Sequence, residues 1–205
     1  DLRLTIDELK TQLNKTQQIV DNLKDDKRDL IANETTRKIR DSLVRNVYEN
    51  LTKGLNIDNT NGDIEVKVDK AVVYVDISEK VLFKSGSFEL TDKANASLEQ
   101  IAKLIQAKSS FDVIVEGHTD DVPYNGSKEI SDNWDLSAKR ATAVVRLLKN
   151  NYGVNPSRIT AAGRAEFNPI ADNRTIEGRA KNRRIKIIIT PTLEQFGKLL
   201  EKATE

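Results

Sequence analysis

The chain has 205 residues and carries 33 Lys and Arg against 32 Asp and Glu, so its formal net charge is +1. A balance so close to neutral gives no general attraction to nucleic acid or to an anionic membrane. The chain has no cysteine, which excludes disulfides and thiolate metal sites. It also has no apolar run of about 18 residues, the length that spans a bilayer. Because it begins at Asp1 and contains no Met, we expect a preceding segment, and membrane contact only through that segment.

Residues 1–53 are predicted to form a helical stalk, and residues 1–33 have the spacing of a coiled coil. Apolar side chains there recur at alternating steps of three and four on an otherwise polar surface. A solvated lone helix is the alternative, but a helix with so few packed contacts is weakly stable in water. We therefore predict that residues 1–33 self-associate, as a dimer, with Thr16 and Lys27 weakening the seam. The seam consists of Leu2, Ile6, Leu9, Leu13, Val20, Leu23 and Leu30.

A change in the character of the sequence marks the end of this stalk. Helical spacing stops at Gly54, a natural helix terminator. Residues 54–62 contain the turn-forming stretch Asn59-Thr60-Asn61-Gly62 and are predicted to be a linker. Beyond the linker, residues 64–68 and 73–77 alternate apolar and polar side chains. Strands with one buried face have this pattern.

Strands and helices alternate through the remainder of the chain. Their order, β-β-α-β-α-β-β, predicts an α+β domain over residues 63–191 with a single mixed sheet and helices packed on one face. The expected elements are a short apolar run at Val81–Phe83, a helix from Thr91 or Asp92 to about Ile105, a strand over Phe111–Gly117, a helix over 132–151, a strand over Ile159–Ala165, a polar loop over Glu166–Asn182, a strand over Arg183–Thr190 and a short C-terminal helix within 192–205.

Charged side chains of both signs gather where the strand Phe111–Gly117 meets the following loop and helix. Asp120 and Asp121 come just after the strand, and Arg140 lies two turns into the helix. Loops held on rigid elements are where binding residues usually lie. Residues 116–148 therefore form the candidate site.

Four motifs, in order along the chain, resemble those of one known family. Val81-Leu82-Phe83 followed by Ser85-Gly86-Ser87 resembles its opening strand and turn, and Gly117-His118-Thr119-Asp120 resembles its strand-end motif. Asn182-Arg183-Arg184-Ile185 resembles its closing strand. Residues 81–190 are thus similar to the OmpA-like peptidoglycan-binding domain of outer-membrane anchors, peptidoglycan-associated lipoproteins and MotB-type stator proteins. The spacing of its signature helix falls on Asn133, Leu136, Ser137, Arg140, Ala141, Val144 and Leu148.

The resemblance implies non-covalent binding of the diaminopimelate residue in the stem peptide of peptidoglycan. Diaminopimelate presents a free carboxylate and a free ammonium, so its receptor needs one fixed anion and one fixed cation. Asp120 can accept from the ammonium, and Arg140 can donate two parallel hydrogen bonds to the carboxylate. Asn133 either contacts the peptide groups of the stem or caps its own helix. The candidate ligand-binding residues are Phe83, Thr119, Asp120, Asn133, Leu136, Arg140 and Arg183.

Some of these residues also have a purely structural interpretation. The alternative for Asp120 and Arg140 is a buried structural ion pair. His118 is expected to be a packed or hydrogen-bonded residue at the strand end rather than a metal ligand. Trp134 is either a core residue or an aromatic wall beside the ligand, and the core is favoured.

Other classes of function lack their motifs. The glycines are too scattered for a phosphate-binding loop, and there is no cysteine nucleophile or nucleophile-elbow serine. The basic stretch 179–184 has no interleaved aromatic residues and runs into an apolar strand, so nucleic acid is not an expected partner. Within that stretch, one of Arg183 and Arg184 is expected beside the site and the other in solvent. We predict a binding module without catalytic residues, cofactor or metal.

The resulting hypothesis is a periplasmic cell-envelope protein, associated with the outer membrane, that holds the cell wall through Asp120 and Arg140. The coiled coil oligomerises it or holds it off a membrane. The alternative is a protein-interaction or stator-like motor component, in which the coiled coil carries the main function and the wall domain is a tether.

Overall fold

The computed structural model describes residues 2–57, 62–84, 86–108, 110–124 and 130–192. It divides the chain into two compact units. One consists of Asp1–Asp41 with Leu193–Glu205, and the other of Ser42–Thr192. Apart from Thr192, the predicted C-terminal helix within 192–205 lies outside the described residues.

The long N-terminal helix is confirmed. Helix α1 (Leu2–Gly54) begins in the first unit and ends in the second. Within the first unit, its described heptad side chains, from Ile6 to Leu30, are exposed. The coiled coil over residues 1–33 stays a prediction. None of the helices in the described part of the chain contains a stretch both long and apolar enough to cross a lipid bilayer.

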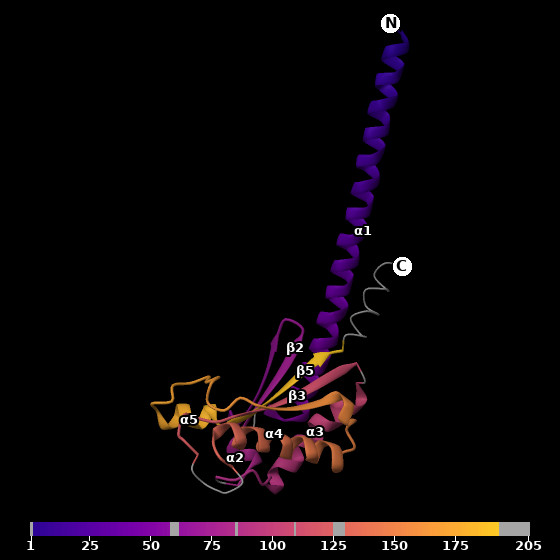
Figure 1. Cartoon of the computed structure of the whole chain (residues 1–205). Helices are drawn as coiled ribbons and strands as arrows, with labels where there is room; N and C mark the ends of the chain where they lie inside the picture. Colours follow the sequence, from indigo (N-terminus) through magenta and orange to yellow (C-terminus); the bar gives the residue numbers. More distant parts are fainter. Residues whose placement is uncertain (1, 58–61, 85, 109, 125–129, 193–205) are drawn as a thin grey trace. The chain divides into compact units, whose positions relative to one another are not determined.

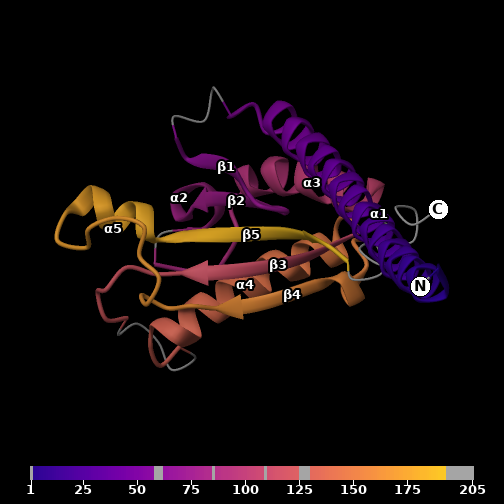
Figure 2. The ribbon, with the colours of Figure 1, turned by 90° about the horizontal axis from the view of Figure 1, so that it is seen from above.

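The second unit is built on a five-stranded mixed sheet in the order β1-β2-β5-β3-β4 (Figure 2). Strands β3 and β4 are parallel, and every other neighbouring pair is antiparallel. This arrangement confirms the predicted α+β class. The strands are β1 (Ile64–Asp69), β2 (Val72–Ser78), β3 (Phe111–His118), β4 (Ile159–Gly163) and β5 (Arg184–Pro191).

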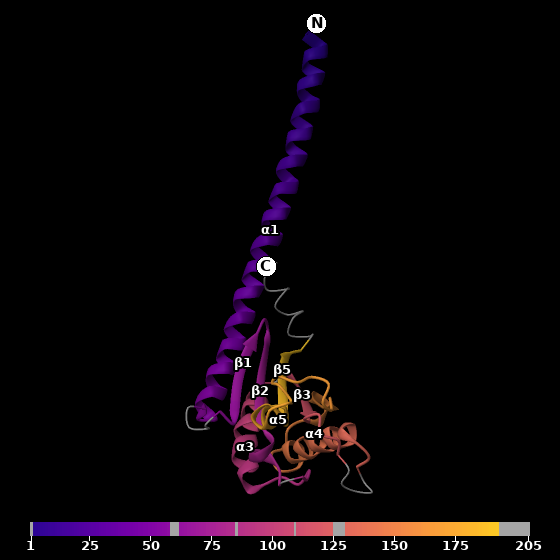
Figure 3. The same cartoon turned by 90° about the vertical axis from the view of Figure 1, so that its left-hand side faces the viewer.

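Apolar alternation along the strands decides which face of the sheet is buried. In β2, Val73, Val75 and Ile77 are fully buried, whereas the residues between them are half-exposed. Helices α3 (Asp92–Ala107) and α4 (Asn133–Asn150) lie on that apolar face (Figures 1 and 3). A turn of 3-10 helix, η2 (Pro156–Arg158), leads from this layer into β4.

The compact unit begins earlier than the sequence predicted. Val44, Val47 and Leu51, on the last turns of α1, are each no more than 2% exposed and belong to the core cluster of the unit. The predicted boundary, with residues 1–53 as a stalk and 54–62 as a linker, is therefore wrong for the end of the helix. The spacing that suggested a continuing stalk is the face that packs on the domain.

Two short helices replace elements that the sequence suggested. The expected opening strand at Val81–Phe83 is largely a one-turn helix, α2 (Glu79–Leu82), and only Phe83 forms a bridge, with Leu90. The predicted polar loop over Glu166–Asn182 contains a further helix, α5 (Ile176–Asn182). Both helices are too short to give a helical repeat in the sequence. Both flank the site described next.

Candidate functional site

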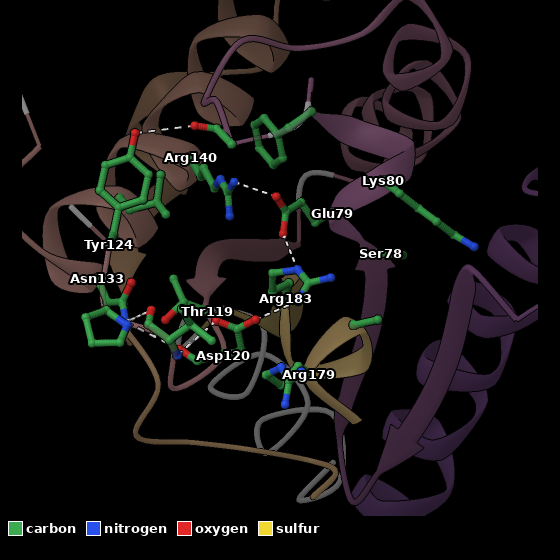
Figure 4. Close-up of a pocket in the computed structure, with 16 residues that line it drawn as sticks. Ser78, Glu79, Lys80, Thr119, Asp120, Tyr124, Asn133, Arg140, Arg179 and Arg183 are labelled. Atoms are coloured by element: carbon green, nitrogen blue, oxygen red, sulfur yellow. Dashed lines mark hydrogen bonds and ion pairs between the residues drawn. The ribbon is translucent and has the colours of Figure 1, made fainter. Parts of the chain in front are cut away.

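All seven predicted site residues line one cleft of about 650 Å³ in the second unit (Figure 4). Side chains from the end of β2, from α2, from the loop after β3, and from α4 and α5 converge on it. The sequence missed several lining residues, of which the charged ones are Glu79, Lys80 and Arg179. The predicted members are Phe83, Thr119, Asp120, Asn133, Leu136, Arg140 and Arg183.

A chain of four charged side chains crosses this cleft (Figure 4). Arg140 donates from Nη2 to Glu79 Oε1 at 2.6 Å, and Arg183 Nε lies 2.9 Å from Glu79 Oε2. Arg183 also donates from Nη1 to Asp120 Oδ2 at 2.6 Å. The described residues include no direct Asp120–Arg140 ion pair, so that structural interpretation is wrong in its direct form. The two groups are instead linked through Glu79 and Arg183.

The Arg140 side chain is held in place by several contacts, but one of its hydrogen-bond donors has no acceptor among the described residues. It is 2% exposed, its Nε donates to the Ser87 carbonyl at 3.0 Å, and its guanidinium lies 5.3 Å from the centre of the Phe83 ring. Burial lowers the pKa of Arg140, and the neighbouring Glu79 carboxylate opposes that shift. Among the described residues, its buried Nη1 has no hydrogen-bond partner. An unmet buried donor costs free energy, so this group favours an incoming acceptor.

Thr119 provides a second unsatisfied group in the same cleft. The residue is 4% exposed, and within the described part of the chain its buried hydroxyl has no hydrogen-bond partner. The backbone of Thr119 is fixed, because its N–H donates to the Ala165 carbonyl at 2.9 Å. A hydroxyl can donate or accept, so it suits either charged end of a zwitterion.

Asn133 fixes the loop that carries Asp120. Asp132, not Asn133, caps α4, because the Asp132 side chain accepts from the Asp135 N–H at 2.9 Å. The capping interpretation of Asn133 is therefore wrong. Its Nδ2 instead donates to the carbonyls of Val122 at 3.1 Å and of Asp120 at 3.4 Å. Asp120 Oδ1 in turn accepts from the Val122 N–H at 3.2 Å.

A close approach between strand and helix sets the position of Arg140. A Cβ added to Gly117, near the end of β3, would lie 2.1 Å from the backbone oxygen of Ser137 on α4. Only glycine permits this contact. Ser137 also accepts from the Ala165 N–H at 3.1 Å through its hydroxyl. Arg140 follows Ser137 by three residues, so the strand end holds the turn of α4 that carries it.

One of Arg183 and Arg184 was expected beside the site and the other in solvent, and only the first half of this prediction holds. Arg183 lines the cleft, but Arg184 does not face solvent: it is 3% exposed and pairs with Asp76 at 3.2 Å. Arg184 alternates with the core residue Ile185, so it lies on the other face of the sheet.

Two aromatic residues near the site gave different outcomes. His118 packs at the strand end as expected, with 1% of its surface exposed. Burial lowers the pKa of His118 to about 3, with smaller contributions in the same direction from Arg184, Lys186 and Arg164. Trp134 was expected in the core, yet it is 49% exposed, and it does not line the cleft. In the described part of the chain, no group of three or more His, Asp and Glu side chains is placed to hold a metal ion.

The residue that sequence reasoning missed most clearly is Glu79. It follows β2 directly, and pairing of β2 with β5 brings it beside Arg183, whose carbonyl accepts from the Glu79 N–H at 3.0 Å. The sequence predicted β2 and β5 but could not show that they are neighbours in the sheet. Without knowledge of that pairing, Glu79 looks like any other acidic residue on the surface.

The fold is of the α+β class with a charged cleft at one end of its sheet, and comparison with known proteins identifies its family. The model of the OmpA family matches residues 82–183. A solved cell wall anchor of the T6SS from Pseudomonas aeruginosa is 32% identical, with a TM-score of 0.62 over 69% of this chain and 97% of that chain. The chain belongs to the OmpA family.

Motility proteins are among its relatives. Motility protein B of Bacillus subtilis (strain 168) is 30% identical over 148 residues, which are 72% of this chain and 56% of that protein. The chain thus spans little more than half of this relative. A solved putative MotB-like protein from Desulfovibrio vulgaris is 28% identical, with a TM-score of 0.67 over 75% of this chain and 96% of that chain.

Proposed function

We propose that this chain binds peptidoglycan non-covalently through the diaminopimelate residue of the stem peptide, and so anchors an envelope protein to the cell wall. One observation carries the proposal. An acidic side chain, Asp120, and a buried guanidinium with a free donor, Arg140, lie in the same cleft. The head group of diaminopimelate carries the complementary pair of charges.

In this proposal the ligand carboxylate takes the unmet Nη1 donor of Arg140, and the ligand ammonium donates to Asp120. Charge-assisted hydrogen bonds of this kind are stronger than neutral ones. Glu79 and Arg183 hold both groups in place before the ligand arrives, which lowers the entropy lost on binding. Phe83 and Leu136 supply apolar contact for the aliphatic part of diaminopimelate.

The role is proposed to be binding rather than catalysis. Two acidic residues, Glu79 and Asp120, belong to the chain of charges in the cleft. Each of them contacts an arginine. Carboxylates that form ion pairs with guanidinium groups suit the recognition of a charged ligand through hydrogen bonds. The solved relative described as a cell wall anchor supports anchoring. A solved periplasmic domain of Helicobacter pylori MotB, which is similar to this chain, supports a location in the periplasm. We propose that the protein is also associated with the outer membrane.

The experiment compares two kinds of purified sacculi in a pulldown. Sacculi with diaminopimelate in the stem should retain the chain, and sacculi with lysine at that position should retain it at least about tenfold less, because lysine lacks the carboxylate that Arg140 would bind. Equal retention by both kinds would contradict recognition of diaminopimelate.

We further propose that residues 1–33 pair two copies of the chain. Joined copies would hold the wall at two points, and the second contact would benefit from a high effective concentration. The exposed apolar side chains of α1, from Ile6 to Leu30, support this pairing.

Similarity to motility protein B favours a second candidate, a stator-like motor component that the wall domain tethers. Deletion of the gene in its host separates the two roles. A motor component predicts loss of swimming with an intact envelope, whereas a general anchor predicts a weakened envelope.

A further inference from the structure

Trp134 and Phe167 form an exposed aromatic stack that the cleft does not use. Their ring centres lie 5.5 Å apart with an interplanar angle of 28°. Trp134 is 49% exposed and Phe167 is 68% exposed, although large aromatic side chains are usually buried. We call these two residues the aromatic platform. Exposed apolar surface of this kind marks binding sites more often than scattered single residues do.

Both residues of the aromatic platform lie close in the chain to residues that line the proposed ligand cleft or bond to it. Trp134 directly follows Asn133, which lines the cleft. Phe167 follows Ala165 by two residues, and the Ala165 carbonyl accepts from the N–H of Thr119, another cleft residue. The two rings therefore project from the first turn of α4 and from the loop after β4, both of which are joined to residues of the cleft.

The backbone beneath the aromatic platform is fixed by buried contacts. Trp134 lies in the capped first turn of α4. Ala165 is fully buried with a φ of 48°, a left-handed conformation that costs a residue with a Cβ free energy. Hydrogen bonds at both its N–H and its carbonyl hold it there. Beyond Phe167, the Asn168 carbonyl accepts from Arg184 Nη2 at 3.2 Å. Such a surface is preorganised for a rigid ligand.

We propose that the aromatic platform binds a sugar ring of the glycan strand whose stem peptide occupies the cleft. The inference rests on the proposed function. Two amino acids separate diaminopimelate from the sugar-linked lactyl group, and because one of them is joined through its side-chain carboxyl, the extended pair spans roughly 10 Å. The sugar therefore lies outside the cleft, and in this proposal it packs on the two rings. One face of a sugar ring presents C–H groups, which pack on the flat face of an aromatic side chain, while its hydroxyls remain in solvent.

Trp134 also reports on its own contact, because it is the single tryptophan of the chain. The full chain is titrated with two soluble ligands, the free stem tripeptide containing diaminopimelate and the same tripeptide on its disaccharide. We expect the disaccharide-tripeptide to shift or quench the tryptophan emission clearly more than the free tripeptide does. Identical emission changes with both ligands would overturn the inference.

Calorimetry on variants then assigns the effect to the rings. Trp134→Ala and Phe167→Ala should each weaken disaccharide-tripeptide binding by about three- to tenfold and leave free-tripeptide binding unchanged. Ile176→Ala is the matched control, since Ile176 is 72% exposed near the start of α5 and lines no part of the cleft. It should bind both ligands as the wild-type chain does.

The outcomes separate the inference from the proposed function. If the wild-type chain binds neither ligand, the proposed function fails and the inference fails with it. If the chain binds both ligands equally and the ring variants change neither, the cleft role stands and the sugar contact is overturned. The aromatic platform would then face another partner, such as a protein surface.

Discussion

At the scale of single residues, the cleft depends on buried and half-buried charged side chains that compensate one another. Glu79 contacts two guanidiniums, so it offsets the cost of burying Arg140 beside Arg183. Removal of one member of such a group leaves the others unpaired, which costs more than the pair contributes. Glu79 therefore supports the site even if it never touches a ligand.

His118 gives a prediction about pH at the same scale. Burial lowers its pKa to about 3, well below the ordinary value of 6.5 that the unfolded chain has. As pH falls below 6.5, His118 gains a proton in the unfolded chain but stays neutral in the folded chain. The free energy of unfolding therefore falls. Between pH 6.5 and pH 5, the free energy of unfolding should fall by up to about 2 kcal/mol more in the wild type than in His118→Gln.

Urea denaturation at several pH values measures this difference. Groups remote from residue 118 are common to both proteins, so their effects cancel in the comparison. A constant gap between the two proteins from pH 6.5 to pH 5 would show that folded His118 takes up its proton normally.

At the scale of elements, the contact between β3 and α4 places the cleft residues. Gly117→Ala would put a methyl carbon 2.1 Å from a backbone oxygen, which cannot move as a flexible side chain can. We expect a loss of about 3 kcal/mol or more in the free energy of unfolding. Any folded fraction should bind sacculi poorly, since α4 carries Arg140.

Gly54→Ala is the matched control for this substitution. A Cβ there meets its nearest neighbour, Gln100 Oε1, at 3.5 Å, an ordinary contact. Its free energy of unfolding should stay within about 0.5 kcal/mol of wild type. If Gly117→Ala were as stable as Gly54→Ala, the close packing of α4 on the strand would be contradicted.

The elements that the sequence predicted well are those with a strong local pattern. Alternation in residues 64–68 and 73–77 located β1 and β2, and a capping residue with helical spacing located α3 and α4. The helix α5 was missed because its seven residues are too few to show the apolar periodicity of a helix. Asp120 and Arg140 were found because strand, loop and helix follow one another in the chain, whereas Glu79 reaches the cleft only through strand pairing.

At the scale of the whole molecule, α1 serves two units. Its residues up to Asp41 belong to the first, and from Ser42 onward the helix packs into the core of the second. The sequence could not place this boundary, because a helix facing a copy of itself and a helix facing a sheet share nearly the same apolar spacing.

Two truncations test the boundary. Removal of residues 1–41 should leave a monomer with an unchanged melting temperature, because it removes the proposed pairing segment and nothing from the core cluster of the second unit. Removal of residues 1–53 also takes away Val44, Val47 and Leu51, and should lower the free energy of unfolding by about 4 kcal/mol or more. Sedimentation and thermal melts measure both effects. A dimer without residues 1–41, or equal stability of both fragments, would contradict the assignment.

The central claim is that Asp120 and Arg140 together hold the charged head of the wall peptide, and pulldown of cleft variants by diaminopimelate-containing sacculi tests it most directly. Asp120→Asn and Arg140→Lys, each with a wild-type circular dichroism spectrum, should be retained at least about tenfold less than the wild type. Arg174→Ala, which removes an exposed arginine that pairs with Asp172 outside the cleft, should be retained as the wild type is. Full retention of a folded Asp120→Asn or Arg140→Lys variant would contradict the account.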